Sequence, residues 1–238
     1  MGIYLFIGIV AFLAGFIQGL TGFGSVLLSL PLMALFLDMK TAVPLVAMYA
    51  TVLSLYLLVQ LWEHWRWSDI YPLFLGCIPG VPLGVWFLKQ MDPLWIQWII
   101  GIVLVLYSLY GLLWKPVVRG TKKFWAYAFG FASGFLGGAI AAAGPPVIVY
   151  TSLQPWSKDR IKVTLQGFFV ASGSLVVFFQ SLAGLVTGTV LVYFLAAIPL
   201  LLGGTWAGSL LYGRVREETY RKILFVFLAI LGVMMLRN

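Results

Sequence analysis

The sequence predicts an all-α polytopic membrane protein made of two inverted-topology repeats, each with about five helical elements. Three observations lead to this fold class. The composition is too apolar for a soluble domain, one glycine-rich stretch occurs twice, and the basic residues are unevenly distributed among the segments that join the apolar runs. We expect the first two elements of each repeat to form a hairpin that is broken at its glycines.

The composition excludes a soluble domain. Hydrophobic residues make up 62% of the chain, charged residues only 9%, and the mean hydropathy is +1.04, which leaves too little polar side chain to cover a surface. The net charge of +8 comes from short basic clusters between apolar runs. Such clusters are typical of cytoplasmic loops, whereas a nucleic-acid partner would require a continuous basic face.

A duplication divides the chain. Residues 15–25 (GFIQGLTGFGS) recur 115 positions later as residues 130–140 (GFASGFLGGAI). Later segments match at drifting offsets: Lys40 with Arg160, Ser54 with Ser174, and Gly80-x-x-x-Gly84 with Gly204-x-x-x-Gly208. The sequence therefore predicts a first membrane repeat at 1–114, a basic cytoplasmic linker at 115–123 and a second membrane repeat at 124–238.

The uncharged runs place the helices in order, since a membrane-crossing helix needs about 20 residues. Four runs suit one span each and lie at 41–62, 70–88, 93–114 and 223–236. The run 163–213 is long enough for two spans. We expect the run 163–213 to break between its two spans at 184–188. The runs 1–37 and 124–157 are too long for one helix and cramped for two, and each contains a glycine-rich stretch.

The loop charges indicate how these two runs cross the membrane. If each were a single long span, only six of the 15 Lys and Arg residues would face the cytoplasm. If each is a hairpin with both ends on one side, twelve face the cytoplasm, and only Lys40, Lys89 and Arg237 do not. The second count is the usual asymmetry. Because five elements per half is an odd number, the second half is expected to be inverted, with the N-terminus of the chain outside.

The glycine-rich stretches are the candidate functional centre. A short helix that begins after each glycine break would present unpaired N–H groups and the positive end of its dipole near mid-membrane, which suits an anion. In the second half Pro145 and Pro146 are expected to open such a helix, about 15 Å long. The alternative is that glycines spaced as Gly15-x-x-x-Gly19 and Gly130-x-x-x-Gly134 only let helices pack closely.

Neutral polar residues accompany the glycines and could donate hydrogen bonds to sulfonate-type oxygens without burying a counter-charge. The predicted substrate-binding residues are Gln18, Thr21, Gly22, Gly24, Ser25, Ser133, Gly137, Gly138 and Gln166. Further polar residues on the following helices are Thr51, Ser54, Ser172 and Ser174. Each of these side chains could instead form a helix-to-helix hydrogen bond.

Several chemistries have no residues to carry them. No ionisable residue falls within a predicted membrane core, so no intramembrane proton relay is predicted. The sequence has no metal-ligand cluster, no phosphate-binding loop and no nucleophile with an adjacent base. We therefore expect no enzymatic activity, no cofactor and no metal.

The two glycine stretches, the segment Gly144-Pro145-Pro146 and the related pairs Ile78-Pro79 and Ile198-Pro199 resemble the sulfite exporter TauE/SafE family, also called toluene sulfonate uptake permeases. The resemblance covers essentially the whole chain. It implies a multi-pass transporter in the inner membrane of a prokaryote, with a small sulfur-containing anion such as sulfite, sulfoacetate or another organosulfonate as its substrate.

Export by alternating access is the expected mode, because an anion leaving an inside-negative cell needs no coupling ion. The alternatives are organosulfonate uptake coupled to Na⁺ or H⁺, an anion channel, and a membrane-embedded assembly or receptor subunit that carries nothing. The expected partners are the anion and the lipid bilayer, with no nucleic acid and with a homodimer as one option for the assembly.

Overall fold

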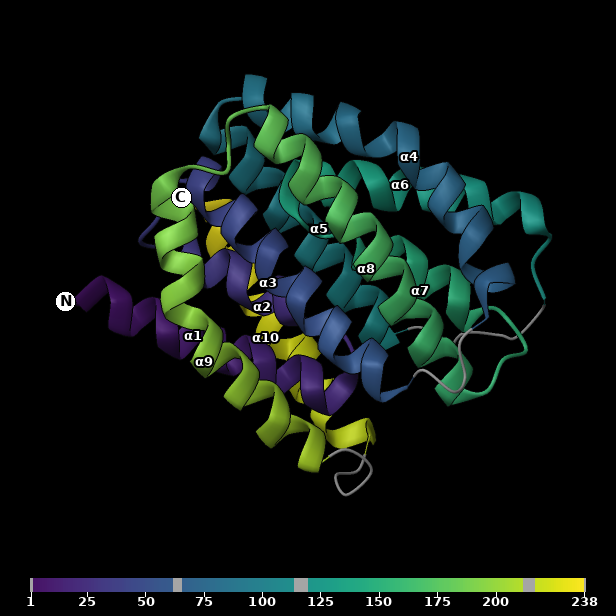
Figure 1. Cartoon of the computed structure of the whole chain (residues 1–238). Coiled ribbons are helices and arrows are strands. Elements are labelled where there is room, and N and C mark those ends of the chain that lie inside the picture. Colours follow the sequence, from purple (N-terminus) through teal and green to yellow (C-terminus); the bar gives the residue numbers. More distant parts are fainter. Residues whose placement is uncertain (1, 62–65, 114–119, 212–216, 238) are drawn as a thin grey trace.

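The computed structural model describes residues 2–61, 66–113, 120–211 and 217–237; the side chains of Lys158 and of 217–224 lie outside the description. Every regular element in these ranges is a helix, as predicted (Figure 1). The ten helices are α1 (Gly2–Thr21), α2 (Ser25–Met33), α3 (Met39–Gln60), α4 (Trp67–Gln90), α5 (Pro93–Leu113), α6 (Lys123–Ile140), α7 (Gly144–Ser152), α8 (Lys158–Leu182), α9 (Gly188–Leu210) and α10 (Glu217–Arg237).

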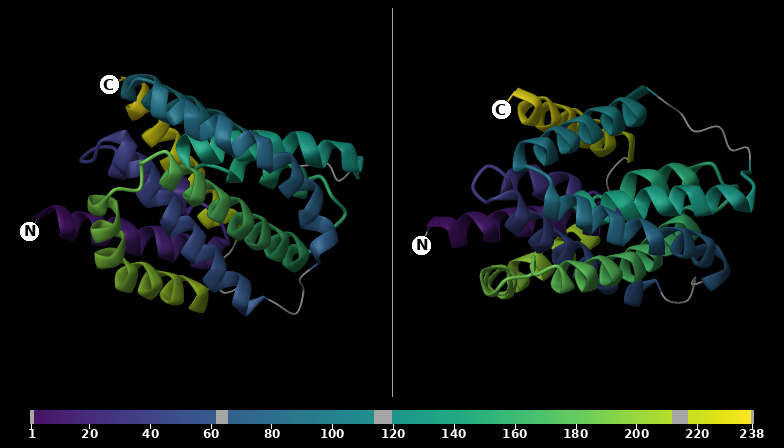
Figure 2. Two further views of the ribbon diagram at one scale, coloured as in Figure 1. Left: turned by 45° about the horizontal axis from the view of Figure 1, so that its top comes forward. Right: turned by 90° about the horizontal axis from the view of Figure 1, so that it is seen from above.

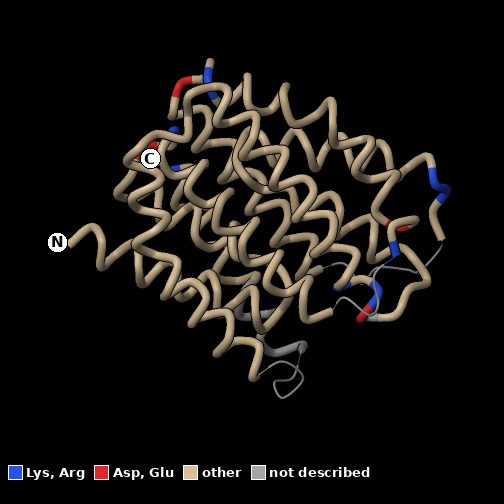
Figure 3. The backbone as a smooth tube through the Cα atoms, viewed as in Figure 1, with Lys and Arg blue, Asp and Glu red and all other residues tan. Residues whose placement is uncertain are grey.

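The chain is a multi-pass membrane protein. Six of the described helices, α1, α3, α4, α5, α8 and α9, are long and apolar enough to cross a bilayer. The described charged residues gather at the two ends of the bundle and are absent from its middle (Figure 3), where a charge would be costly in lipid. The predicted break at 184–188 agrees with the turn between α8 and α9. Most of the predicted linker 115–123 lies outside the described residues.

Both ambiguous runs of the sequence form a hairpin of one long and one short helix. The short helices α2 and α7 have nine residues each, which is about 14 Å and about half of a hydrocarbon core. The first hairpin turns at residues 22–24, within the predicted glycine cluster.

The second hairpin turns one helical turn later than the sequence suggests. Gly137 and Gly138 still belong to α6, and the break lies at residues 141–143. Ala141 ends α6 in a left-handed conformation, with φ 56°, and its N–H donates to the Gly137 carbonyl at 2.9 Å. The prediction that each hairpin is broken at its glycines is therefore wrong for Gly137 and Gly138 of the second hairpin, because glycine in a close helix contact is compatible with regular helix.

The long helix of the first hairpin, α1, lies along α9. A Cβ on Gly15 or Gly19 would collide with main-chain atoms of Leu201 or Thr205, so the two backbones touch. Contacts advance in the same direction along both helices, which therefore run parallel. These glycines pack helices together, the alternative role that their spacing indicated.

The long helix of the second hairpin, α6, makes a corresponding contact with α4. Gly130 and Gly134 lie against the backbone of Leu73 and Cys77, again in parallel. Helix α4 therefore packs mainly with the second half of the chain, and α9 packs with the first. The remaining long helices pair as α3 with α8 and α5 with α10; Figure 2 shows α10 (yellow) along α5.

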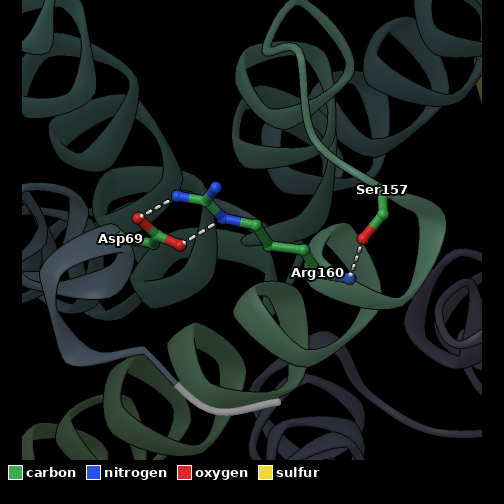
Figure 4. A network of polar contacts seen from close by, with 3 residues as sticks. All are labelled: Asp69, Ser157 and Arg160. Atoms are coloured by element: carbon green, nitrogen blue, oxygen red, sulfur yellow. Dashed lines mark hydrogen bonds and ion pairs between the residues drawn. The ribbon is translucent and has the colours of Figure 1, made fainter.

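An ion pair ties α4 to α8 at one end of the bundle (Figure 4). Arg160 donates from Nε to Asp69 Oδ2 at 2.7 Å and from Nη2 to Oδ1 at 2.8 Å, the two-pronged geometry that favours arginine. The guanidinium also lies 4.7 Å from the ring centre of Trp156. Ser157 accepts a hydrogen bond from the Arg160 N–H and caps α8.

Candidate functional site: a cavity between two hairpin tips

A cavity of about 60 Å³ lies where the two hairpin tips meet the middle of α3 and α8. The first hairpin contributes Gln18 and residues 23–27, and the second contributes Gly137 and residues 141–145. None of the described residues that line it carries a charge. At about 10–15 Å³ per water on this measure, the cavity has room for about four waters or one small anion.

Three polar side chains form a network at the first tip. Gln18 is 2% exposed; its amide oxygen accepts a hydrogen bond from the Ser25 hydroxyl, and its Nε2 donates to Ser54 Oγ at 3.0 Å. All three residues line the cavity. One N–H of the Gln18 amide and the hydroxyl proton of Ser54 are not used in this network, so both can donate to a ligand.

The first tip also presents the N-terminus of α2. The first four N–H groups of a helix have no partner inside it, and here they belong to Gly24, Ser25, Val26 and Leu27, which all line the cavity. Gly24 occupies the N-cap position with φ 96°, a conformation that favours glycine. Since glycine has no side chain to cap the helix, these donors stay available to an anion.

The second tip offers fewer donors. Ala143 is the N-cap of α7, and Gly144 is followed by Pro145 and Pro146, which have no N–H. Two of the four donors are therefore missing, and the remaining lining from this hairpin is Gly137, Ala141, Ala142 and Ile148. This side of the cavity is apolar.

Helix α8 supplies one further polar group. Ser172 lines the cavity, is 1% exposed, and its hydroxyl has no hydrogen-bond partner among the described residues. A buried hydroxyl without a partner is costly, and a ligand that accepts its proton would remove that cost. Together with Gln18 and Ser54, it provides neutral donors in the cavity wall.

The structure brings four of the nine predicted site residues to the cavity: Gln18, Gly24, Ser25 and Gly137. Two others stand beside the first tip without lining it. Thr21 accepts the Phe23 N–H at 3.1 Å and so supports the turn. Gly22, with φ 83°, donates to the Gln18 carbonyl at 2.7 Å.

The other three predicted residues lie outside the cavity lining. Gln166, on α8, donates to the Gly22 carbonyl. Gly138 packs against α4, where an added Cβ would strike Val81 and Val85 main-chain atoms. Ser133 is fully buried in α6, with no partner for its hydroxyl among the described residues.

Sequence reasoning also missed part of the lining. It named Ser54 and Ser172 only in a wider group, in which Ser174 is exposed on the far side of α8. The alanines at 141–143 carry no polar signal and could have been found only by placing the break correctly. Phe23 and Phe169 line the cavity as well, and in sequence they look like any other apolar residue.

Comparison with known proteins places this arrangement in a family. A family model described as sulfite exporter TauE/SafE matches residues 7–235. The chain belongs to the TauE/SafE family. A curated protein from Cupriavidus necator, named probable sulfite/organosulfonate exporter TauE, is 23% identical over 174 residues, which cover 71% of this chain and 68% of the relative. No solved structure matches the chain.

Membership of the TauE/SafE family makes the chain a membrane transporter and not an enzyme. The matched residues include both hairpins and the whole cavity. The cavity is therefore the candidate substrate site of a transporter.

Proposed function

We propose that this chain exports a small sulfur-containing anion, sulfite or a small organosulfonate, across the cytoplasmic membrane of a prokaryotic cell by alternating access. The observation that carries the proposal is the cavity at the first hairpin tip, where the N-terminus of α2 and the Gln18 amide converge. The substrate class is supported by the family and by the name of the relative from Cupriavidus necator, probable sulfite/organosulfonate exporter TauE.

The chemistry of the cavity suits weak, reversible binding of an anion. Backbone N–H groups, the Gln18 amide and the hydroxyls of Ser54 and Ser172 are all neutral donors. A transporter must release its substrate as readily as it captures it. Neutral donors favour this, because an anion is not locked to a buried counter-charge in the cavity wall.

The packing supports an inverted repeat. Gly15 and Gly130 are 115 positions apart, and their partners Leu201 and Leu73 are 128 apart. Gly19 and Gly134 repeat the relation with Thr205 and Cys77, also 128 apart. One contact is thus made twice, with the roles of the two halves exchanged.

The helix contacts also change which glycines of α4 correspond to those of α9. Gly76 and Gly80 lie against the backbone of Tyr127 and Phe131. Gly204 and Gly208 make the same contacts with Phe12 and Phe16, 115 positions earlier. The counterparts of the α9 glycines are therefore 76 and 80, one turn before the pair that the sequence match suggested.

This packing gives the molecule two groups of helices that could move against each other. One group is α1, α2, α3 and α9, and the other is α4, α6, α7 and α8; the contact of α3 with α8 lies between the two groups. Each group holds one hairpin, and the cavity lies between them. Rocking of one group against the other would open the cavity to each side of the membrane in turn.

The driving force favours export. An anion that leaves an inside-negative cell gains about 2.3 kcal/mol per charge per 100 mV of membrane potential. None of the described residues that line the cavity could carry a coupling proton. Potential alone would then be sufficient for export.

Transport by the purified protein in proteoliposomes tests the proposal, with membrane potential and ion gradients imposed independently. We expect saturable movement of sulfite or methanesulfonate that is driven by potential alone and falls at least about tenfold in Gln18→Leu. Movement that requires an Na⁺ or H⁺ gradient would establish coupled uptake instead, and unsaturable currents would establish a channel. No movement of any sulfur anion, with folded protein in the vesicles, would contradict the proposed substrate class.

A further inference from the structure

One residue of the predicted cytoplasmic basic clusters is partly buried. Lys162 belongs to the second turn of α8 and is half-buried. Its Cε, Cγ and Cδ atoms lie 3.1, 3.2 and 3.5 Å from the point where a Cβ on Gly22 would stand. The lysine stem therefore lies across the turn of the first hairpin, in space that a side chain at position 22 would crowd.

The next turn of α8 fixes the same hairpin residue. The side-chain amide of Gln166, which is fully buried, donates to the Gly22 carbonyl. Lys162 and Gln166 are four residues apart and so share one face of the helix. Further along that face, at intervals of three or four residues, Phe169, Gly173 and Val176 line the cavity. Lys162 thus stands at the end of the helix face that forms the cavity wall.

The side chain of Lys162 lies beside the part of the first hairpin that leads into the cavity wall. Gly22, which its stem covers, is two residues from Gly24 in the cavity wall, and the described lining carries no charge of its own. Asp159 is close enough to interact with Lys162, and Asp69 is engaged by Arg160. A charge at the rim of a low-dielectric cavity acts over a longer range than one in water.

We propose that Lys162 is the charge-selecting residue of this site: its ammonium group attracts an anion to the first hairpin tip and repels cations from it. The choice of an anion as ligand rests on the proposed function, whereas the electrostatic effect of Lys162 on the cavity can be measured without any substrate. A lysine suits this role because its flexible stem can follow the hairpin while the charge stays at the rim.

Thiol modification measures that electrostatic effect. Cys77 is the only cysteine and is fully buried, so Cys77→Ala gives a background without reactive thiols. Ala50, half-buried on the α3 side of the cavity, becomes the probe as Ala50→Cys. The measured quantity is the ratio of its reaction rates with a negatively charged and a positively charged methanethiosulfonate reagent.

In the Cys77→Ala, Ala50→Cys protein we expect Lys162→Met to lower the ratio of anionic to cationic reagent rates by about tenfold, because a unit charge at the cavity rim acts oppositely on the two reagents. Lys162→Arg keeps the charge and should preserve the ratio. Lys123→Met removes an exposed charge at the start of α6 and is the matched control for net charge. Lys162→Gln serves if the methionine variant does not fold.

An unchanged ratio in Lys162→Met, or an Ala50→Cys thiol that neither reagent reaches, would overturn the proposal. Transport in proteoliposomes then separates it from the proposed function. If Lys162→Met leaves the reagent-rate ratio unchanged and the wild-type protein transports sulfite, only the role of Lys162 is refuted. A ratio effect in a protein that moves no sulfur anion would refute the substrate class and leave Lys162 as the selecting charge.

Discussion

The two hairpin tips face the same cavity, but they offer it different groups. The first presents the donors of α2, with Gly24 at the N-cap and the Gln18 amide beside it. The second turns on Ala141 and begins α7 with Pro145 and Pro146. Outside the cavity the long helices of the two hairpins are alike, since each lies on a neighbouring helix through glycines spaced four apart.

The difference indicates which constraints each surface is under. The packing faces of α1 and α6 need close backbone contact, and only glycine permits it. The tips are free of that constraint and can specialise. An anion bound between them would be held mainly by the first hairpin, while the second would form an apolar wall that moves past it.

The largest expected effect is a difference in stability between alanine variants of the two neighbouring glycines in the second hairpin. In Gly138→Ala the new Cβ would strike main-chain atoms of α4, including Val85 N at 2.8 Å, and we expect destabilisation of about 3 kcal/mol. In Gly137→Ala it would meet the Ala143 side chain at 3.1 Å, so we expect a loss of about 1 kcal/mol and a reduced cavity.

Thermal unfolding in detergent measures these stabilities, and proteoliposome transport measures the second effect. Gly137→Ala should fold and raise the KM for sulfite, whereas Gly138→Ala should give little folded protein. Equal stability of the two variants would show that Gly138 does not form the close contact with α4.

The next effect compares Gln18 with its counterpart Ser133, 115 positions later. Gln18→Leu removes a donor from the cavity and leaves Ser25 and Ser54 without their partner, so transport should fall at least about tenfold. Ser133→Ala removes a buried hydroxyl that has no partner among the described residues, so stability should stay the same or rise by up to about 1 kcal/mol.

Transport rates and unfolding temperatures of Gln18→Leu and Ser133→Ala test these two expectations. Normal transport by Gln18→Leu would exclude the first tip as the binding side. Reduced transport by stable Ser133→Ala would mean that the second hairpin also contacts the substrate.

Much of the fold could be predicted from the sequence, because charge placement and run length act through general costs of burial in lipid. The two hairpins and the turn between α8 and α9 follow from those costs. The site was predicted less well. Gly22 and Gly24 lie at the turn of the first hairpin, but Gly137 and Gly138 do not lie at the turn of the second, because glycine permits a turn without requiring one.

Contacts between distant segments were beyond sequence reasoning. The pairing of α4 with α6 and of α1 with α9 decides which glycines pack and which line the cavity. The position of Lys162 over Gly22 depends on how α8 crosses the first hairpin. Neither relation leaves a periodic signal within one segment.

Substitutions at the positive-φ residue of each tip should change the stability of the protein in opposite directions. Gly24 has φ 96° and Ala141 has φ 56°. Gly24→Ala should destabilise the protein by about 1–2 kcal/mol, since an L side chain disfavours this region. Ala141→Gly should relieve strain and, after the entropy cost of glycine, stabilise it by about 0.5–1 kcal/mol. Thermal unfolding in detergent distinguishes the signs, and a destabilising Ala141→Gly would mean that the second turn depends on alanine packing.

The smallest expected effect tests whether the second tip takes part in binding at all. Pro145→Ala restores one N–H group at the start of α7, on the apolar side of the cavity. If the first tip holds the anion, the KM for sulfite should change less than about threefold, and stability should fall by up to about 1 kcal/mol because the chain regains freedom when unfolded. Titration of transport against sulfite concentration measures the KM. A marked fall in KM would mean that the new donor reaches the substrate, and the anion would then lie between the two tips and not at the first alone.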